Sequence, residues 1–285
     1  MSKTLETALA LPPINTKTAL TILTRTLQNE VTKTGISKVV IGVSGGIDSA
    51  LTLYLAARVF PKENIHAIFM PYQSSSPSSR DHAHEATDKL GVKLDTVEIT
   101  NMADPYFATF PPEERLRRGN ILARLRMIVL YDQSAARRAL VLGTSNKTEM
   151  LLGYSTLWGD MASAVNPLGD LYKFQVRALS RELGVPDNII DKPPSADLWE
   201  GQNDEDEMDI TYNLADRILY HWIDKAWPKT RITAALKASG ENPENADLVF
   251  QKVQRSQFKR KMPIIVKLSE TTVDREFRYP RDWGL

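Results

Sequence analysis

An apolar β-branched run, a glycine turn and a helix-forming segment follow one another without interruption early in the chain. The run occupies 39–43, Ser44-Gly45-Gly46 forms the turn, and leucines and alanines continue through 50–56. The two glycines allow positive φ angles and close approach of a ligand. Backbone N–H groups after Gly45 are therefore expected at a helix N-terminus, pointing toward an anion. The tract predicts a buried strand that ends in a phosphate-binding loop.

Two commoner nucleotide-binding loops do not fit this tract. The lysine of a Walker A loop is absent, and the glycine spacing differs from that of a dinucleotide fingerprint. The residues instead resemble the Ser-Gly-Gly-x-Asp-Ser loop of the ATP-pyrophosphatase superfamily, whose members hold the β,γ-pyrophosphate of ATP while a substrate attacks the α-phosphorus. The resemblance implies adenylation, with Asp48 holding phosphate through Mg²⁺. A glycine turn without a ligand is the alternative.

Strand and helix patterns alternate from this loop onward. Strands are expected at 39–43, 65–70, 93–99 and 139–143, with helices up to 59, over 79–90, over 120–137 and after 143. Alternation of this kind predicts an α/β fold with an open, twisted parallel sheet flanked by helices on both faces, similar to adenine-nucleotide hydrolases. Ligands of such sheets bind beyond the C-terminal ends of the strands.

The rest of the chain is expected to complete one synthetase-type domain over 1–285. A helix over 15–34 precedes the first strand, with Asn15 as its start signal. After Pro193-Pro194 an acidic run predicts a mobile loop over 195–210, followed by a helical C-terminal part over 211–262. A serine-rich stretch over 73–79 is either a nucleotide-facing loop or a flexible connection.

Charge and composition exclude several classes of function. With 36 basic and 35 acidic residues the net charge is +1, which disfavours a nucleic-acid or membrane partner. No apolar run approaches the roughly 20 residues that span a bilayer, and the first residues do not resemble a secretory signal, so a cytoplasmic protein is expected. Cysteine is absent, which removes disulfides, thiolate metal sites and cysteine nucleophiles.

A second acidic residue is a candidate for the same site as Asp48. Glu149 follows the fourth expected strand and falls in the first turn of the next helix, where the helix dipole alone could explain it. In a site that needs Mg²⁺ it is also a natural second ligand. His82 and His84 lack the spacing of a zinc site and are expected at the surface.

Six motifs together resemble those of the NAD synthetase family. They occur in the family's order, and the similarity extends from the N-terminal helix to about Pro263. The motifs lie at 44–49, 119–127, 143–154, 159–160, 166–173 and 194–198. The stretches Asn146-Lys147-Thr148-Glu149 and 166–173 separate this family from other users of the loop.

The resemblance implies a two-step reaction. The nicotinate carboxylate of deamido-NAD attacks ATP, pyrophosphate leaves, and ammonia displaces AMP to give NAD. It further implies a homodimer, Asp48 and Glu149 as Mg²⁺ ligands, Asp48 and Lys173 as catalytic residues, and substrate contacts from Arg124, Asp160 and Lys259. The ATP-binding positions that it implies are Gly42, Val43, Ser44, Gly45, Gly46, Ile47, Asp48, Ser49, Thr144, Lys173 and Ser195. Taken alone, Arg124, its neighbour Arg126 and Lys173 could each be surface cations.

Three positions depart from the family pattern on the dinucleotide side. Leu157 and Ala164 replace a lysine and an aspartate of many members, and Phe258 replaces a histidine before Lys259. Trp158 could stack on the nicotinate ring, although a single tryptophan is more often part of a core. Apart from Lys259, the basic residues at 252–261, Arg260 among them, are expected to be a solvated helix end.

The sequence leaves open two further functions and the source of nitrogen. Glutamine-using relatives carry an amidase domain built around a catalytic cysteine, so free ammonia or a separate glutaminase is expected here. Sulfur transfer is disfavoured by the missing thiol. The changes at 157, 164 and 258 leave room for a nucleotide-binding protein without turnover.

Overall fold

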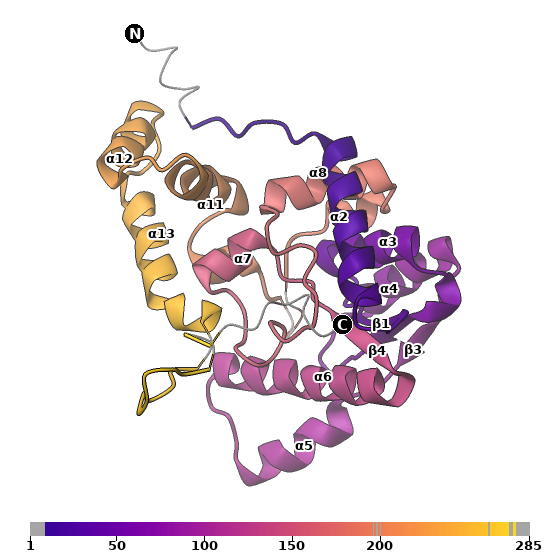
Figure 1. Ribbon diagram of the computed structural model, residues 1–285. Coiled ribbons are helices and arrows are strands. Elements are labelled where there is room, and N and C mark those ends of the chain that lie inside the picture. The colour runs from indigo at the N-terminus through magenta and orange to yellow at the C-terminus, as the bar shows by residue number, and fades with distance from the viewer. Residues whose placement is uncertain are drawn as a thin grey trace.

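A four-stranded parallel sheet organises the N-terminal two thirds of the molecule. The computed structural model describes residues 9–195, 197, 199, 201–261, 263–273 and 276–277. The strands lie in the order β3-β2-β1-β4, with β1 (Lys38–Gly42) central (Figure 1). Val39 of β1 pairs with Ile65 of β2 (Ile65–Phe69), and Val40 pairs with Val141 of β4 (Ala139–Leu142). β3 (Leu94–Thr96) lies at the edge beside β2.

Both faces of the sheet are buried, as its β-branched sequence predicts. Val39 and Ile41 belong to the core beneath α2 (Thr16–Thr32), α3 (Ile47–Val59), α4 (Pro77–Leu90) and α8 (Lys173–Leu183). Val40 points to the other core, which α5 (Thr100–Thr109) and α6 (Arg115–Arg137) cover (Figure 1). Alternate residues of one strand therefore join two helical layers, which confirms the predicted architecture.

A third core joins helices beyond the sheet. It is built around buried residues such as Tyr212, Ile218, Leu236 and Val249. The helices concerned are α7 (Lys147–Leu152), α10 (Asp204–Met208), α11 (Tyr212–Leu219), α12 (Lys229–Ala238) and α13 (Glu244–Arg255). Of these, α11, α12 and α13 lie within 211–262, whereas α10 lies within 195–210, where the sequence predicted a mobile loop. A π-helical turn at Tyr220–Asp224 follows α11, and 3₁₀ turns occur at Lys62–Asn64 and Gln257–Arg260. The short helix α9 (Asp187–Ile190) packs on α8 and α3.

The helices α5 and α6 and the strand β3 differ from the sequence prediction. α5 was not predicted, because Pro105 lies inside it and lowers its helix propensity. Burial of Ala103 and Phe107 against the sheet stabilises this helix. The third strand is confined to 94–96, and α6 begins at Arg115 rather than near 120. None of the described helices is long and apolar enough to cross a membrane.

Candidate active site

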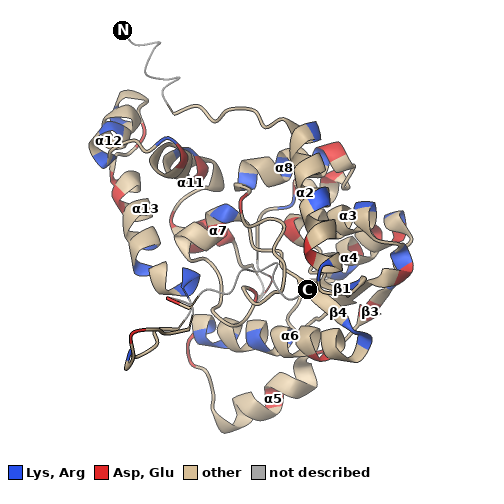
Figure 2. Ribbon diagram, viewed as in Figure 1, with Lys and Arg blue, Asp and Glu red and all other residues tan. Residues whose placement is uncertain are grey.

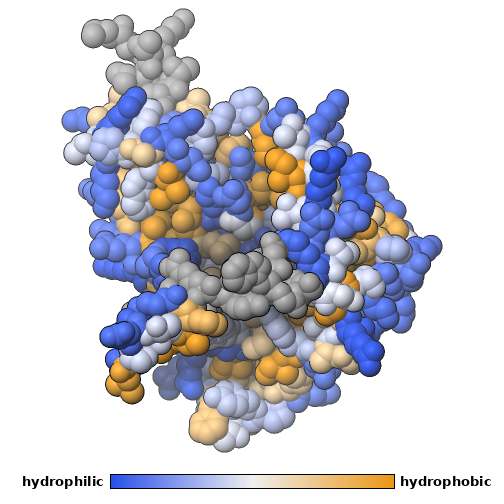
Figure 3. Space-filling view, viewed as in Figure 1, coloured by the Kyte–Doolittle hydropathy of each residue, from blue (hydrophilic) through white to orange (hydrophobic). Residues whose placement is uncertain are grey.

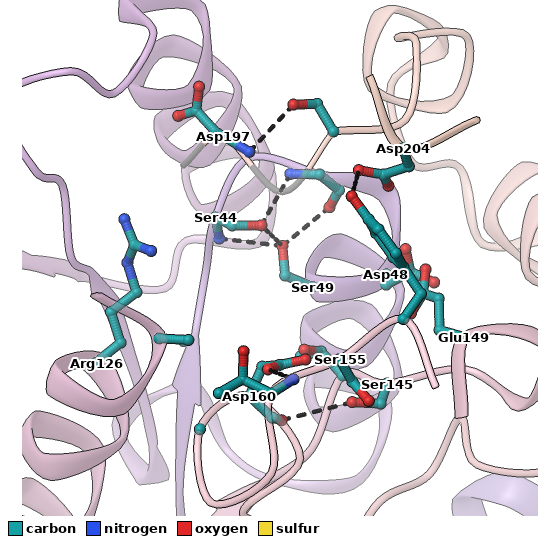
Figure 4. A pocket seen from close by; sticks show the side chains of 18 of the residues that line it. Ser44, Asp48, Ser49, Arg126, Ser145, Glu149, Ser155, Asp160, Asp197 and Asp204 are labelled. Atoms are coloured by element: carbon teal, nitrogen blue, oxygen red, sulfur yellow. Dashed lines mark hydrogen bonds between the residues drawn. The ribbon is translucent and has the colours of Figure 1, made fainter. Parts of the chain in front are cut away.

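A pocket of about 400 Å³ opens at the C-terminal ends of β1 and β4, where the sequence placed the ligand. The loop after β1 forms its floor, α7 and the start of α8 form one wall, and α6 forms the opposite wall. Figure 4 shows Ser44 and Ser49 in the middle of this pocket, with Asp48 and Glu149 on one side and Arg126 on the other. Three distant parts of the chain thus meet around one loop.

Gly45 is the residue that requires glycine in this loop. Its φ is +79°, and a Cβ atom there would lie 2.2 Å from the carbonyl oxygen of Ser79. Gly45 is buried and does not line the pocket, whereas Gly42, Val43, Ser44, Gly46 and Ile47 do. Gly46 does not use the positive φ that glycine allows. It has φ −94° and caps α3 in an extended conformation that other residues adopt.

Hydroxyl groups fix the loop against the start of α3. The Ser44 N–H donates to Ser49 Oγ at 3.1 Å, the Ser49 hydroxyl donates to the Gly46 carbonyl at 2.9 Å, and the Gly46 N–H donates to Ser44 Oγ at 3.3 Å (Figure 4). These bonds hold the loop curled over the N-terminus of α3. The N–H groups of the first turn of a helix lack intrahelical partners, so the loop is shaped to receive an anion.

Lys173 joins the two predicted acidic residues. Its Nζ lies 2.6 Å from Asp48 Oδ2 and 3.0 Å from Glu149 Oε1. The side chain is only 3% exposed, so the alternative of a surface cation is wrong. Although burial alone would lower the pKa of Lys173, the carboxylates of Asp48 and Glu149 outweigh it and raise that pKa. The lysine is therefore a permanent cation.

Glu149 is both a helix cap and a pocket residue. It closes a capping box at the start of α7, where its N–H donates to Asn146 Oδ1 and its carboxylate accepts from the Asn146 N–H. Its other oxygen accepts from the Tyr212 hydroxyl at 3.1 Å. Burial raises the pKa of Glu149 to about 7, and the nearby charge of Asp48 acts in the same direction. The cap therefore holds a carboxyl group in a place where its charge is costly.

Both carboxylates fit an Mg²⁺ ion by their chemistry and placement. Asp48 and Glu149 supply the hard oxygen ligands that Mg²⁺ prefers, and they already share one cation, the ammonium of Lys173. Asn146 Nδ2 donates to Asp48 Oδ1 at 2.8 Å and orients that side chain. Water and phosphate oxygens would have to complete the coordination sphere.

The sequence did not single out an acidic and aromatic cluster behind this pair. Asp204 of α10 is buried, and its carboxylate accepts from the hydroxyls of Tyr154 at 2.8 Å and Tyr212 at 3.2 Å. The Tyr154 hydroxyl also lies 2.9 Å from Glu207 Oε2, and Gln202 donates to Glu207. The acidic run at 200–209 was a visible signal, but it pointed to a solvated loop.

Asp160 and Lys259 occupy a second region of the pocket. Asp160 lines the pocket, and its carboxylate accepts from the Thr156 N–H at 2.6 Å. Desolvation by the surrounding protein nevertheless raises its pKa. Lys259 Nζ donates to the carbonyls of Gly153 and Ser155 at 2.7 and 2.6 Å, and burial lowers its pKa. The two residues are close enough to influence each other electrostatically.

Arg124 and Arg126 of α6 point to different places. Arg124 donates twice to the Leu157 carbonyl, at 3.1 and 3.2 Å, and is not one of the residues that line the pocket. Arg126 lines it and donates to the Met70 carbonyl at 2.9 Å. Burial lowers the pKa of Arg126 to about 10, against the opposing effects of Asp197 and Asp160. Trp158, next to Leu157, is 48% exposed, so the expectation of a core tryptophan is wrong.

Polar loops close the remaining side of the pocket. Thr144 and Ser195 line it, as do Ser75 and Ser79 from the serine-rich stretch, which favours the nucleotide-facing interpretation of that stretch. The Ser76 N–H donates to both carboxylate oxygens of Asp197 at 3.1 Å. Asp197 is thus tied to the start of α4, which follows the loop after β2.

Among the basic C-terminal residues, Arg255 and Lys261 are exposed as expected, whereas Arg260 is not. Arg260 donates to the carbonyls of Met150, Leu151 and Val253, so its assignment to a solvated helix end is wrong. Carbonyls at the ends of two helices, α7 and α13, gather around this guanidinium. Phe258 is exposed, and the Ala164 N–H pairs with the Val141 carbonyl of β4.

Comparison with known proteins agrees with this geometry. The family model for NAD synthase matches residues 19–263. The NH(3)-dependent NAD(+) synthetase of Trichlorobacter lovleyi is 53% identical over 95% of this chain and 98% of its own length. Among solved structures, an NH3-dependent NAD synthetase from Campylobacter jejuni superposes with a TM-score of 0.76 at 31% identity, covering 90% of this chain and all of the other. An NMN synthetase from Francisella tularensis gives 0.76 at 32%, covering 89% and 99%.

These likenesses extend across the sheet, the loop, α7 and the helical C-terminal part. The family match alone includes 245 of the 285 residues, counted from 19 to 263. The motifs that the sequence offered and the pocket that the structure forms lie within the matched range. The chain belongs to the NAD synthase family.

Proposed function

We propose that the protein amidates deamido-NAD to NAD in an ATP-dependent reaction that uses ammonia and releases AMP and pyrophosphate. The observation that carries the proposal is the convergence of Asp48, Lys173 and Glu149 on the Ser44–Ser49 loop at the start of α3. The relatives named NH(3)-dependent NAD(+) synthetase, at about half identity over nearly the whole chain, support the choice of substrates.

The loop and Lys173 would hold the triphosphate. N–H groups at the start of α3 and the Ser44 hydroxyl would donate to phosphate oxygens, Ser49 keeps the loop in shape, and Lys173 adds a buried positive charge. Thr144 and Ser195 line the same pocket and would contact the nucleotide. A carboxylate is a weak nucleophile toward a polyanion, so alignment and charge neutralisation are the main tasks of these residues.

Asp48 and Glu149 would hold Mg²⁺ against the phosphates. When bound, the ion neutralises charge on the departing pyrophosphate. Asn146 keeps Asp48 turned toward the pocket, and the capping box keeps Glu149 there. These second contacts fix both ligands before the nucleotide arrives.

The deamido-NAD end would use Asp160, Lys259 and Arg124. Asp160 and Lys259 face the pocket beyond the phosphate loop. Arg124 lies outside it on α6, bonded to the Leu157 carbonyl, and would bind a more distant part of the dinucleotide. Figure 2 shows that the N-terminal half of α6 is rich in basic residues, which suits a substrate that carries two phosphates.

A second copy of the chain is proposed to cover the outer face of α5 and α6. Large apolar side chains stand exposed there, and Figure 3 shows apolar groups at the surface in this lower part of the view. They are Met102, Tyr106, Phe110, Leu116, Ile128 and Tyr131. A patch of this kind is typical of a protein interface. We expect light scattering to give the mass of a dimer for the wild type and for Ile22→Glu on α2, and the mass of a monomer for Ile128→Glu. A monomeric wild type would refute the dimer.

Free ammonia is the proposed nitrogen donor, with a separate glutaminase as its alternative source. The Trichlorobacter relative, of nearly equal length, is named for ammonia. An ATP-consuming reaction of this kind fits the cytoplasm, where we expect the protein to act.

One assay tests the function. Purified protein with ATP, Mg²⁺, deamido-NAD and ammonium should form NAD, AMP and pyrophosphate in equal amounts. Because one structural relative is an NMN synthetase, nicotinate mononucleotide is the necessary competing substrate, and we expect it to react more slowly. Formation of ADP would refute adenylation. If neither deamido-NAD nor nicotinate mononucleotide leads to AMP, a nucleotide-binding protein without turnover is favoured.

A further inference from the structure

The oxygens of Asp48 and Glu149 are already occupied by donors of the protein. Asp48 Oδ1 accepts from Asn146 Nδ2, and Asp48 Oδ2 accepts from Lys173. Glu149 Oε1 accepts from Lys173 and Tyr212, and Glu149 Oε2 accepts from the Asn146 N–H at 3.4 Å. A divalent ion bound to these carboxylates would therefore share their oxygens with these donors and lie close to the Lys173 ammonium.

Lys173 is the donor whose displacement matters most. Its ammonium is the only one of these donors that carries a charge, and it contacts both carboxylates. Its Nζ also lies 4.6 Å from the centre of the Tyr212 ring, so its third N–H faces an aromatic surface. Two like charges brought together at such a buried place repel strongly, because water screens them little.

We propose that Lys173 and the divalent cation compete for Asp48 and Glu149, so that the metal binds together with the nucleotide phosphates and only weakly before them. Phosphate oxygens at the loop would accept the Lys173 ammonium and so leave the carboxylates to the metal. By linkage, the metal and the phosphates then strengthen each other's binding. The inference rests on the proposed ATP and Mg²⁺ site, but not on turnover.

The competition explains why a single lysine is buried between the proposed metal ligands. The Lys173 ammonium contacts both carboxylates, so its single positive charge offsets part of theirs in a protein without nucleotide. A lysine that only contacted phosphate would not need both carboxylates within 3.0 Å. The arrangement would prevent a bare metal ion from occupying the site without its nucleotide.

The proposal is tested by titrating the full-length protein with Mn²⁺ in the absence of nucleotide. Binding is measured as the decrease in the EPR signal of free Mn²⁺. Lys173→Met removes the competing charge and keeps an unbranched side chain of similar length. We expect Mn²⁺ to bind this variant roughly tenfold or more tightly than the wild type. Lys192→Met is the matched control, because Lys192 also lines the pocket and donates to Ser79 rather than to a carboxylate. It should bind Mn²⁺ as the wild type does.

A second measurement separates this role from a purely structural one. With EDTA present, Lys173→Met should bind α,β-methylene-ATP more weakly than the wild type and Lys192→Met. A lysine needed only for folding would not increase metal affinity when removed. Tight binding of Mn²⁺ to the wild type in the absence of nucleotide would overturn the proposal. So would an Mn²⁺ affinity of folded Lys173→Met equal to that of the wild type. If Lys173→Met does not fold, Lys173→Gln replaces it, with the same expected direction. NAD formation is measured separately, so a failure of the proposed reaction does not decide this test.

Discussion

Gly45 and Ser79 approach so closely that a Cβ atom on Gly45 would lie 2.2 Å from the Ser79 carbonyl oxygen. This contact brings the phosphate loop against the start of α4, because Ser79 belongs to the first turn of that helix. Gly45→Ala should therefore distort the loop as well as strain a φ of +79°. We expect loss of nucleotide binding and a fall in unfolding free energy of more than 2 kcal/mol, measured by calorimetry and chemical denaturation.

Gly184→Ala provides the control for Gly45→Ala. Gly184 has φ +76° at the end of α8, and nothing lies within 4 Å of its missing Cβ. It should lose only the roughly 1–2 kcal/mol of left-handed strain and bind nucleotide normally. Equal behaviour of the two variants would show that the contact with Ser79 has no consequence.

Asp48→Ala should stop pyrophosphate release while the fold remains. The residue lines the pocket on the first turn of α3, outside the apolar cores. We expect pyrophosphate formation to fall on the order of a hundredfold or more, since both metal and Lys173 lose a partner. Asp132→Ala, an exposed acid on α6, should keep full activity. Normal turnover in Asp48→Ala, assayed with a circular dichroism spectrum like that of the wild type, would remove Asp48 from the site.

Local sequence patterns predicted the scaffold of this site well. The β-branched run at 39–43, the glycine turn and the following leucines each act over a few residues, so the strand, loop and helix could be predicted without tertiary information. Asn15 was predicted as a start signal and caps α2 by accepting from the Thr18 N–H. α5 escaped prediction because its stability comes from packing on the sheet and not from its own propensity.

The pairing of polar groups in the pocket could not be predicted from local patterns. Lys173 and Asp48 lie 125 positions apart, and Tyr154 and Asp204 lie 50 apart. Only the folded chain decides which acids of the run at 200–209 are buried and which are solvated. Local patterns also could not distinguish Arg124 from Arg126. They lie two positions apart on one helix, yet Arg126 lines the pocket and Arg124 does not.

Asp216 should make the stability of the protein depend on pH. Burial raises its pKa to about 6, although Thr148 donates to it at 2.5 Å and the Phe174 N–H at 2.8 Å. An acid with a raised pKa in the folded state binds more protons there than in the unfolded state. Its contribution is therefore most favourable below its ordinary pKa of 3.8 and is lost as pH rises through about 6.

Asp216→Asn removes this titration and keeps an oxygen acceptor for the Phe174 N–H. Relative to the wild type, the variant should gain up to about 3 kcal/mol of unfolding free energy between pH 4 and pH 7. Urea denaturation at several pH values measures the difference. Asp191→Asn, whose acid is exposed beside Arg181, should give a nearly constant difference. A constant difference for Asp216→Asn as well would mean that the buried carboxyl is ionised throughout.

The hydroxyl of Tyr154 should decide how firmly the acidic segment is held beside the pocket. It lies 2.8 Å from Asp204 Oδ1 and 2.9 Å from Glu207 Oε2, so it joins α10 to the end of α7. Tyr154→Phe leaves the buried carboxylate of Asp204 with one donor fewer, at a cost of about 1–3 kcal/mol, and removes the bond to the exposed Glu207. If the segment opens and closes over the nucleotide, this loss favours the open form, and limited proteolysis should cut within 201–210 faster than in the wild type. Tyr106→Phe, whose hydroxyl belongs to an exposed ring on α5, should not change the rate. Unchanged protection in Tyr154→Phe would show that the Tyr212 hydroxyl, 3.2 Å from Asp204 Oδ2, is sufficient to hold the segment.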